Sequence, residues 1–309
     1  MHLAEKCVTI YTVMNMLCNL CPRRCGALRT EHTGNGFCGM GTMPVVARVA
    51  PHFGEEPCIS GKNGSGAVFF SGCTMHCMYC QNYEISVKNK GTALSVRQLA
   101  ECYRMLEESG VHNINLVTAD HFAEAVAESL RIYRPNIPVI YNCSGYTSPE
   151  ILTLMDGLVD VYLPDFKYSD NKLAKKLSHT PDYVDTALAS IAEMLFQAGK
   201  PKFDSDGMIQ KGVIVRHLIL PAHTRQSIDA LELLKRNFGD EILVSLMCQY
   251  VPWGEAKRHP KLGRTITKRE YEKVKDVLFA NFSDGFTQDL SAASAEYIPD
   301  WDFDSDSSW

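Results

Sequence analysis

The sequence predicts an α/β protein with a parallel sheet, preceded by a small cysteine-rich lobe. From Ala67 onward, short apolar runs alternate with amphipathic segments, which is the pattern of βα units on a parallel sheet. Residues 1–66 instead combine many Cys, Gly and Pro with little helical periodicity, which indicates a lobe held together by a metal. The chain has 309 residues, of which 45% are hydrophobic, so it is long enough to bury a full core.

Six apolar runs are the expected strands, and the amphipathic segments between and after them are the expected helices. The strands are expected at residues 67–70, 113–118, 139–142, 159–163, 213–220 and 242–247. The helices are expected to begin around Ser95, Phe122, Ser148, Thr180, Ser227 and Thr267. Ser95 with Gln98, and Thr267 with Glu270, form capping-box pairs that mark helix starts. We therefore expect a lobe at residues 1–66, an α/β domain at 67–250 and an extension at 251–309.

Composition excludes several classes of protein. Lys and Arg number 31 against 36 Asp and Glu, giving a net charge of -5, so no global basic field points to nucleic acid. No apolar stretch approaches the length of a membrane span, and the amino terminus lacks the layout of a secretory signal. We expect a cytoplasmic protein without a membrane partner. In a reducing compartment, 12 Cys indicate metal or cluster ligation rather than disulfides.

The most informative group is Cys73, Cys77 and Cys80, spaced CxxxCxxC directly after an expected strand. Three thiolates on one loop are suited to three irons of a [4Fe-4S] cluster, whose fourth iron stays open to a substrate or cofactor. A structural zinc site is the alternative, but it needs a fourth ligand and normally uses CxxC pairs. His76 lies on the same tight loop, where the geometry for a fourth ligand is poor. Buried thiols without a metal are the remaining alternative.

The CxxxCx(aromatic)C motif after the first strand of a six-strand βα array resembles the radical S-adenosylmethionine (SAM) superfamily. Residues 18–26 (CNLCPRRCG), 55–61 (EEPCISG) and 71–82 (SGCTMHCMYCQN) resemble its pyruvate formate-lyase activating enzyme-like branch. The likeness covers almost the whole chain, from Cys18 to about Gln288, and it is more specific for the superfamily than for a substrate. It implies a partial (β/α)6 barrel at 67–250 that uses a [4Fe-4S] cluster and S-adenosylmethionine. It also implies reductive cleavage of S-adenosylmethionine to a 5'-deoxyadenosyl radical, which abstracts a hydrogen atom.

The resemblance and the strand ends together suggest cofactor contacts, although no residue is assigned a catalytic role. The expected cofactor contacts are Tyr79, Thr118, Asn142, Ser144, Asp165, Lys167 and Arg216. Many members of the superfamily carry Gly-Gly-Glu at the second strand end; here Thr118 or Asp120 would supply oxygens instead, or Asp120 simply caps a helix. Ordinary turn chemistry is the alternative for Asn142 and Ser144, and a solvated loop is the alternative for Asp165 and Lys167. Arg216 lies in an apolar run and needs an anionic partner, either the cofactor carboxylate or a structural ion pair with a nearby Asp.

The expected function is that of a radical SAM oxidoreductase which installs a glycyl radical on a partner protein and takes its electron from a flavodoxin- or ferredoxin-type donor. Modification of a peptide, an RNA or a small metabolite fits the same core. A non-catalytic iron–sulfur carrier or scaffold is disfavoured, because a missing fourth ligand leaves a reactive iron.

Two further stretches stand outside this assignment. Cys18, Cys21, Cys25 and Cys38 offer four thiols, which suit either structural zinc or a second iron–sulfur cluster. Residues 257–269 carry six positive side chains without an acid, and an acidic tail follows. The basic run is either a docking patch for a protein or RNA, or a solvated face neutralised by the tail.

Overall fold

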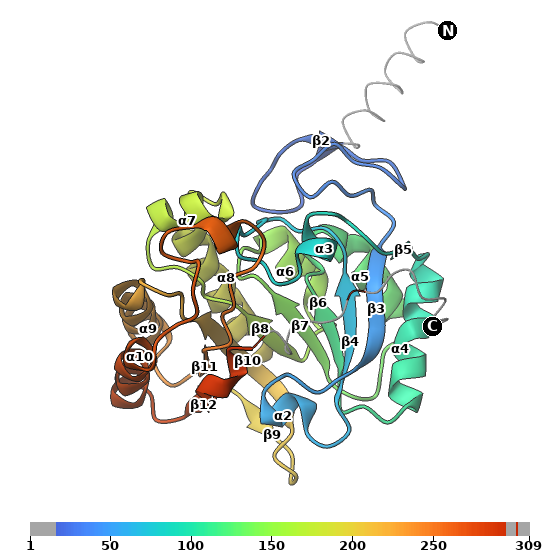
Figure 1. Ribbon diagram of the computed structural model, residues 1–309. Coiled ribbons are helices and arrows are strands. Elements are labelled where there is room, and N and C mark those ends of the chain that lie inside the picture. Colours follow the sequence, from blue (N-terminus) through green and yellow to red (C-terminus); the bar gives the residue numbers. More distant parts are fainter. Residues whose placement is uncertain (1–16, 295–300, 302–309) are drawn as a thin grey trace, which may run out of the picture.

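The fold is a mixed sheet wrapped into a partial barrel with helices on its outer face (Figure 1), seen in a computed structural model that describes residues 17–294 and Trp301. In spatial order the main sheet contains β12 (Gly285–Thr287), β11 (Leu243–Met247), β10 (Ile209–Leu218), β8 (Val161–Pro164), β7 (Val139–Cys143), β6 (Ile114–Val117), β4 (Ser65–Phe70), β3 (Val45–His52) and β5 (Thr92–Ala93), and β9 (Lys202–Phe203) pairs with β10. The run from β12 to β4 is parallel, whereas β3, β5 and β9 pair antiparallel. The predicted α/β fold is therefore confirmed.

All six predicted strands are present as neighbours in this parallel run. Their apolar side chains are buried on both faces, which is why they read as continuous apolar runs rather than as alternating patterns. β10 begins four residues earlier than predicted, because Ile209–Gly212 extends the strand toward β9 through polar residues. β3, β5, β9 and β12 were not predicted, since each is short, polar or interrupted by proline.

The helices connect the strands and cover the outside of the sheet. They are α2 (Pro57–Ser60), α3 (Tyr83–Ser86), α4 (Val96–Glu108), α5 (Ala123–Ile132), α6 (Pro149–Met155), α7 (Asn171–Ser178), α8 (Tyr183–Ala198), α9 (Thr224–Phe238) and α10 (Lys268–Asn281), with 3-10 turns η1 (Asp120–Phe122), η2 (Gly254–Arg258) and η3 (Leu290–Ala292). Both predicted capping boxes are formed, at Ser95 and Thr267. The helix expected from Thr180 is α8, which begins at Tyr183, and the preceding helix α7 was not predicted. α9 begins three residues before Ser227.

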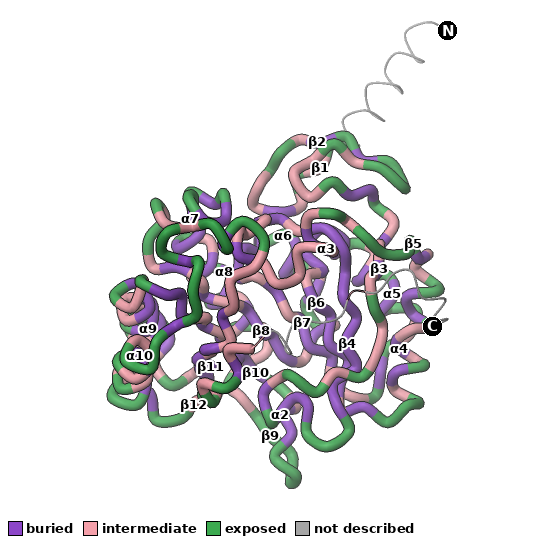
Figure 2. Tube along the Cα trace, in the orientation of Figure 1, coloured by how far each residue is buried: buried purple, intermediate pink, exposed green. Residues whose placement is uncertain are grey.

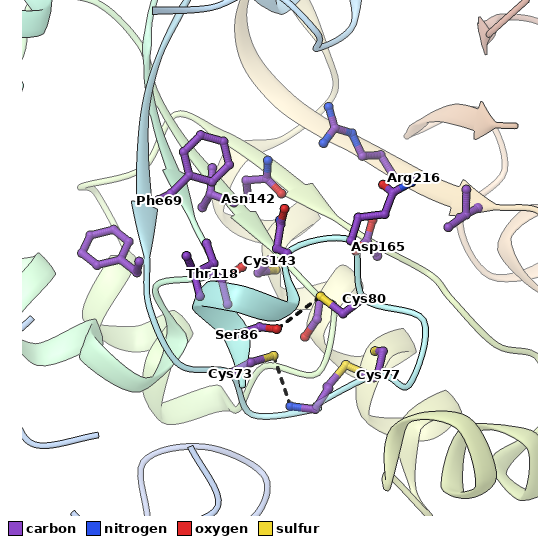
Figure 3. A pocket seen from close by; sticks show the side chains of 18 of the residues that line it. Phe69, Cys73, Cys77, Cys80, Ser86, Thr118, Asn142, Cys143, Asp165 and Arg216 are labelled. Carbon is purple, nitrogen blue, oxygen red and sulfur yellow. Dashed lines mark hydrogen bonds between the residues drawn. The ribbon is translucent and has the colours of Figure 1, made fainter. Parts of the chain in front are cut away.

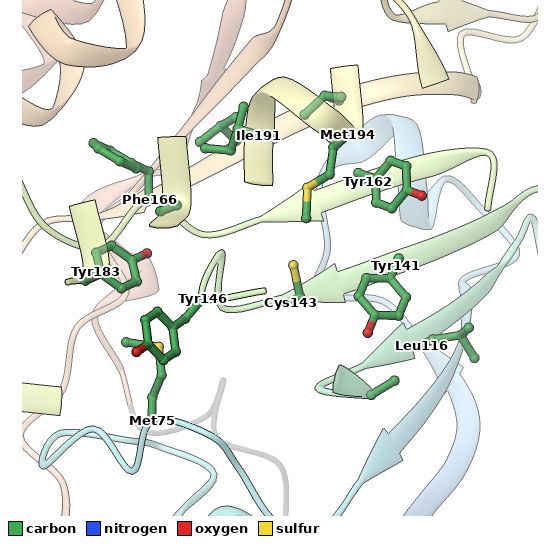
Figure 4. Packing of buried hydrophobic residues seen from close by; sticks show 14 of the residues in the cluster. Met75, Leu116, Tyr141, Cys143, Tyr146, Tyr162, Phe166, Tyr183, Ile191 and Met194 are labelled. Carbon is green, nitrogen blue, oxygen red and sulfur yellow. The ribbon is translucent and has the colours of Figure 1, made fainter. Parts of the chain in front are cut away.

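Two apolar layers hold the sheet in place. The larger one lies between the outer face of the sheet and the helices, where Tyr141, Tyr162 and Met194 pack together (Figure 4). The smaller one lies inside the barrel, where Cys58 and Ile59 of α2 pack on Ile140, Val161, Leu163, Ile209, Ile214 and Leu243. Figure 2 shows the strands as buried and the connecting loops as largely exposed. The helix α2 therefore fills the interior of the barrel at the amino ends of the strands.

The amino-terminal region contains a second, two-stranded sheet, β1 (Leu17–Cys18) with β2 (Ala27–Leu28). Two segments that the sequence groups with the lobe belong to the barrel instead. Residues 45–52 form β3 on the main sheet, and residues 57–60 form the helix α2 inside the barrel. The limits of the three expected parts stay a prediction. No helix in the described part of the chain is both long and apolar enough to cross a membrane. The amino-terminal segment in which no secretory signal is expected, and most of the acidic tail, lie outside the described residues.

Candidate functional site

A cavity of about 690 Å³ opens at the carboxyl ends of the parallel strands. It brings together residues from distant parts of the chain (Figure 3). The predicted site residues that line it are Cys73, Cys77, Tyr79, Cys80, Thr118, Asn142, Ser144, Asp165, Lys167 and Arg216. Ligand sites in α/β folds favour this end of the sheet, because the loops there follow neighbouring strands. The structure thus gathers every expected cofactor contact and all three cysteines of the second group in one cavity, while their roles stay predictions.

The cysteine loop leaves β4 through Ser71 and Gly72. Gly72 has a φ of +84°, and a side chain there would lie 2.6 Å from Cγ of Met40, so the turn favours glycine. The carbonyl of Ser71 lies 2.6 Å from Nε2 of His121, which fixes the start of the loop against η1. Further along the loop, the N–H of Met78 donates to the carbonyl of Leu177 at 2.9 Å. The loop is therefore anchored at both ends by main-chain contacts.

Each of the three sulfur atoms receives at least one hydrogen-bond donor. The N–H of Met75 donates to Sγ of Cys73 at 3.3 Å. The hydroxyl of Ser178 donates to Sγ of Cys77 at 2.9 Å, and that of Ser86 donates to Sγ of Cys80 at 3.3 Å. Burial raises the pKa of Cys73 to about 11 and also raises the pKa values of Cys77 and Cys80, so a metal must displace protons to bind there.

This donor set suits a cluster better than a single ion. Within residues 17–294 and Trp301, no group of three or more His, Cys, Asp or Glu side chains stands close enough together to hold one metal ion. The three protein sulfurs of a cubane bind three different irons and do not meet at one point. His76 stacks on the ring of Phe37 with centroids 4.4 Å apart, on the lobe side of the loop. The residues present therefore fit a [4Fe-4S] cluster with three protein ligands.

Thr118, at the end of β6, has an unusual backbone. Its φ is +63°, a region that β-branched residues rarely occupy, and its N–H donates to the carbonyl of Asn142 at 2.8 Å. Such local strain is often found at functional sites. Asp120 turns away from the cavity: its Oδ1 accepts from Thr147 at 2.8 Å and from Tyr141 at 3.3 Å, and burial raises its pKa to about 6. Of the two candidates at this strand end, Thr118 lines the cavity.

Asp165 and Lys167, beyond β8, form a partly buried ion pair beside the cysteine loop. Burial would lower the pKa of Lys167, but the charge and hydrogen bond of Asp165, together with the nearby sulfurs of Cys77 and Cys80, outweigh this effect and raise it, so the lysine stays charged. The loop that carries them is fixed by Tyr183 of α8. The Tyr183 hydroxyl lies 2.9 Å from the Ser144 carbonyl and 2.8 Å from the Asp165 carbonyl, and it accepts the N–H of Lys167 at 2.9 Å. This geometry differs from the solvated loop that was the alternative interpretation.

Arg216 lies deeper in the cavity, on the inner face of β10. Its guanidinium pairs with Glu55 and Glu56, which precede α2, and its Nε donates to Oε1 of Glu56 at 2.8 Å. The side chains of Glu55 and Glu56 are only 7% and 5% exposed. The ion-pair alternative is therefore what the structure contains, with two glutamates in place of the expected aspartate. A cofactor contact of Arg216 stays a prediction.

A chain of hydroxyl groups links the aromatic residue of the motif to the second cysteine. The Tyr79 hydroxyl lies 2.7 Å from that of Tyr168, which contacts Ser178, and Ser178 donates to Cys77. Sequence reasoning missed Ser86, Tyr168, Ser178 and Tyr183, since no motif marks them. It also missed the glutamates, although 55–61 was singled out as a stretch.

Other side chains at the strand ends pack in the core or line the cavity. His217 is fully buried, and its Nδ1 lies 2.6 Å from the carbonyl of Phe166. Cys143 packs in the layer between sheet and helices (Figure 4), and Cys248 donates to the carbonyl of Asp289 at 3.1 Å. Gln249 and Tyr250, which follow β11, line the cavity.

The four cysteines of the first group lie together in the lobe. Cys18, Cys21, Cys25 and Cys38 line one small cavity between the lobe and the cysteine loop. The sulfurs of Cys21 and Cys38 each accept a main-chain N–H, from Arg23 and Met40, a contact that favours the thiolate. Burial nevertheless raises the pKa of Cys21 to about 12. The prediction of a metal here, zinc or iron–sulfur, stays a prediction.

Comparison with protein families decides the classification. The family model described as the radical SAM superfamily matches residues 67–248, more than half of the chain. The chain belongs to the radical SAM superfamily. The cofactors of this superfamily are a [4Fe-4S] cluster and S-adenosylmethionine, which is cleaved reductively. The cofactors expected from the sequence are thus confirmed for the family, whereas the activating-enzyme branch is not.

This radical SAM protein is similar to an uncharacterized protein of Methanocaldococcus jannaschii, with 28% identity over 84% of this chain and 73% of that protein. Among solved structures, it is similar to SuiB of Streptococcus suis bound to the precursor peptide SuiA, with 14% identity and a TM-score of 0.46 over 72% of this chain. It is also similar to methylornithine synthase (PylB), with 15% identity and a TM-score of 0.46 over 68% of this chain. The chain spans 48% of the length of SuiB and 60% of that of PylB.

Proposed function

We propose that Cys73, Cys77 and Cys80 hold the [4Fe-4S] cluster of this radical SAM enzyme, and that S-adenosylmethionine binds against them at the strand ends. The observation that carries the proposal is the shared cavity, which gathers the three sulfurs and all the expected cofactor contacts. When bound, the cluster supplies the electron that cleaves S-adenosylmethionine to methionine and a 5'-deoxyadenosyl radical.

The surrounding side chains have distinct tasks in this proposal. The Asp165–Lys167 pair offers one charge of each sign to the ammonium and carboxylate of the methionine moiety. Asn142 and Ser144 offer short hydrogen-bonding groups from the neighbouring loop. Tyr183 keeps these two loops at a fixed distance, because its hydroxyl contacts the main chain of both. The protein thereby orients the cofactor and limits access of water to the radical.

We further propose that the abstracted hydrogen comes from a partner protein, leaving a glycyl radical on it. This step is supported by the resemblance of residues 18–26, 55–61 and 71–82 to activating enzymes. The breadth of the cavity is compatible with it, since about 690 Å³ is within the range of pockets that take drug-sized ligands.

Anaerobic reconstitution tests the first part. With iron, sulfide, a chemical reductant and S-adenosylmethionine, the native protein should release 5'-deoxyadenosine, and Cys77→Ala should release none. Cys102→Ala is the matched control, because Cys102 is a half-buried thiol on α4, remote from the loop. Release by Cys77→Ala at the native rate would contradict the assignment of the cluster ligands.

Electron paramagnetic resonance tests the second part. A mixture of the reconstituted enzyme with a glycyl-radical protein should develop a protein-borne radical that depends on S-adenosylmethionine. Release of 5'-deoxyadenosine without such a radical, together with deuterium transfer from a labelled peptide or metabolite, would replace activation by direct modification.

A further inference from the structure

One strongly charged surface has no task in the function proposed above. It consists of exposed basic side chains on α7, on η2 and on the segment that follows η2. We define this basic surface as Lys172, Lys175, Lys176, Lys257, Arg258 and Lys261. The two segments lie side by side, with orange η2 next to yellow-green α7 in Figure 1. Lys176 and Lys261 also lie near the same residue, because the positive charge of each helps to lower the pKa of His223.

The two elements that carry most of the basic surface, α7 and η2, both form hydrogen bonds with one residue of the cysteine loop, Met78. The N–H of Met78 donates to the carbonyl of Leu177 in α7 at 2.9 Å, and its carbonyl accepts the N–H of Ala256 in η2 at 3.3 Å. Lys176 and Lys257 are the neighbours of these two contact residues in sequence. Met78 itself lies between Cys77 and Cys80, two of the proposed cluster ligands.

The charge of this surface is unusual for the chain. The whole protein has a net charge of -5, yet α7 and residues 256–269 contain no acidic residue. Arg264 pairs with Glu270 and is not part of the surface. Exposed acidic side chains next to the surface in sequence are Glu255 in η2 and Asp170, the N-cap of α7. Like charges brought together cost stability, so such a patch commonly has a binding role. Lys257 also lies over the ring of Trp253, 4.5 Å from its centroid, which holds its ammonium beside the loop.

We propose that the basic surface is the docking site of an acidic protein that carries one electron, and that this electron enters at Met78. The inference rests on the proposed function, since it assumes a cluster on Cys73, Cys77 and Cys80. Electron transfer through protein weakens steeply with distance, so the donor must approach the cluster loop from outside. One electron leaves the donor, whose centre is oxidised, and reduces the cluster; no bond forms or breaks and no proton moves. Complementary charge accelerates such encounters and makes them sensitive to salt.

The test compares two sources of electrons in a charge-reversal variant. In Lys257→Glu/Lys261→Glu, the rate of 5'-deoxyadenosine release driven by a purified flavodoxin in its hydroquinone form should fall about tenfold or more at low ionic strength. The difference should shrink as salt is added, because screening removes the attraction. With photoreduced deazaflavin, a small uncharged reductant, the variant should match the native protein.

Lys62→Glu/Lys202→Glu is the matched control, because it makes the same change of charge near α2 and β9, at the opposite end of the barrel (Figure 1). An equal loss in the control, or a native flavodoxin-driven rate in the first variant, would overturn the proposal. Loss of single-stranded RNA binding in the first variant, with an unchanged flavodoxin-driven rate, would assign the surface to RNA instead. Absence of product from the native protein with deazaflavin would count against the cluster assignment rather than against the docking site.

Discussion

Replacing Arg216 with methionine should destabilise the protein strongly. The Arg216 side chain is 11% exposed, and its partners Glu55 and Glu56 are 7% and 5% exposed. The variant therefore leaves two carboxylates in a site with little water and without their counter-ion. Breaking a buried ion pair by removing one partner costs about 3–5 kcal/mol. Methionine preserves much of the apolar volume, so most of the loss reflects charge rather than a cavity.

The stability that Arg216→Met loses should be largest near neutral pH and smaller under mildly acidic conditions. Burial alone would raise the pKa of Glu56, but the charge and hydrogen bonds of Arg216 outweigh it and lower the pKa below its ordinary value of 4.5. A lowered carboxylate pKa contributes stability that is present above the unfolded-state pKa and is lost as the pH falls through the folded-state pKa. In the variant Glu56 loses this partner while its burial remains, so its pKa should rise and the carboxylate should be neutralised on mild acidification. The difference in the free energy of unfolding between the native protein and the variant should thus shrink as the pH is lowered from about 7.5 to about 5.

Urea unfolding of the apoprotein, followed by circular dichroism at both pH values, measures this effect. Arg104 on α4 provides the control, because it also pairs with two glutamates, Glu101 and Glu108, but on the surface. Arg104→Met should change the unfolding midpoint very little, since exposed ion pairs contribute little. Equal losses in the two variants, or a loss at Arg216 that is the same at both pH values, would refute the reasoning.

Three further substitutions test other parts of the site. Thr118→Gly should raise the thermal unfolding midpoint, because it releases a backbone strain of about 1–2 kcal/mol. The conformational entropy that glycine loses on folding offsets up to about 1 kcal/mol of this gain. A lower midpoint would show that the threonine is well accommodated. Tyr183→Phe should cost about 1–3 kcal/mol in urea unfolding and raise the KM for S-adenosylmethionine, because the Asp165 loop loses its anchor; unchanged KM with normal folding would separate the anchor from cofactor binding. Cys21→Ala should chiefly lower the melting temperature and the bound metal per chain, whereas Cys77→Ala should abolish cofactor cleavage; equal loss of turnover in two folded variants would contradict this division of tasks.

The sequence predicts the parallel strands well because burial on both faces leaves continuous apolar runs. It predicts α4 and α10 well because Ser95 and Thr267 form capping boxes whose partners lie three residues away. The elements that escape prediction depend on distant partners. α7 has only eight residues, and its polar composition resembles a loop until it packs beside the cysteine loop.

The site follows the same rule. Cys73, Cys77 and Cys80 are evident from their spacing, and the strand-end residues from their place after apolar runs. The groups that hold them in position are not evident. Ser178 reaches Cys77 across a long stretch of chain, and Glu55 reaches Arg216 from before the barrel begins, so only the folded arrangement reveals these contacts. An ion pair needs a partner, but the sequence does not say which one.

Trp301 packs edge-on against Phe69, with ring centroids 5.4 Å apart, and Phe69 forms part of the cavity wall (Figure 3). Phe69 is made early in translation, and Trp301 is made much later. A nascent chain still attached to the ribosome therefore has the first strand of the barrel without its last neighbour. The wall around Phe69 is completed only after synthesis has reached Trp301, so loading of an oxygen-sensitive cofactor into a finished chamber would follow synthesis of that residue.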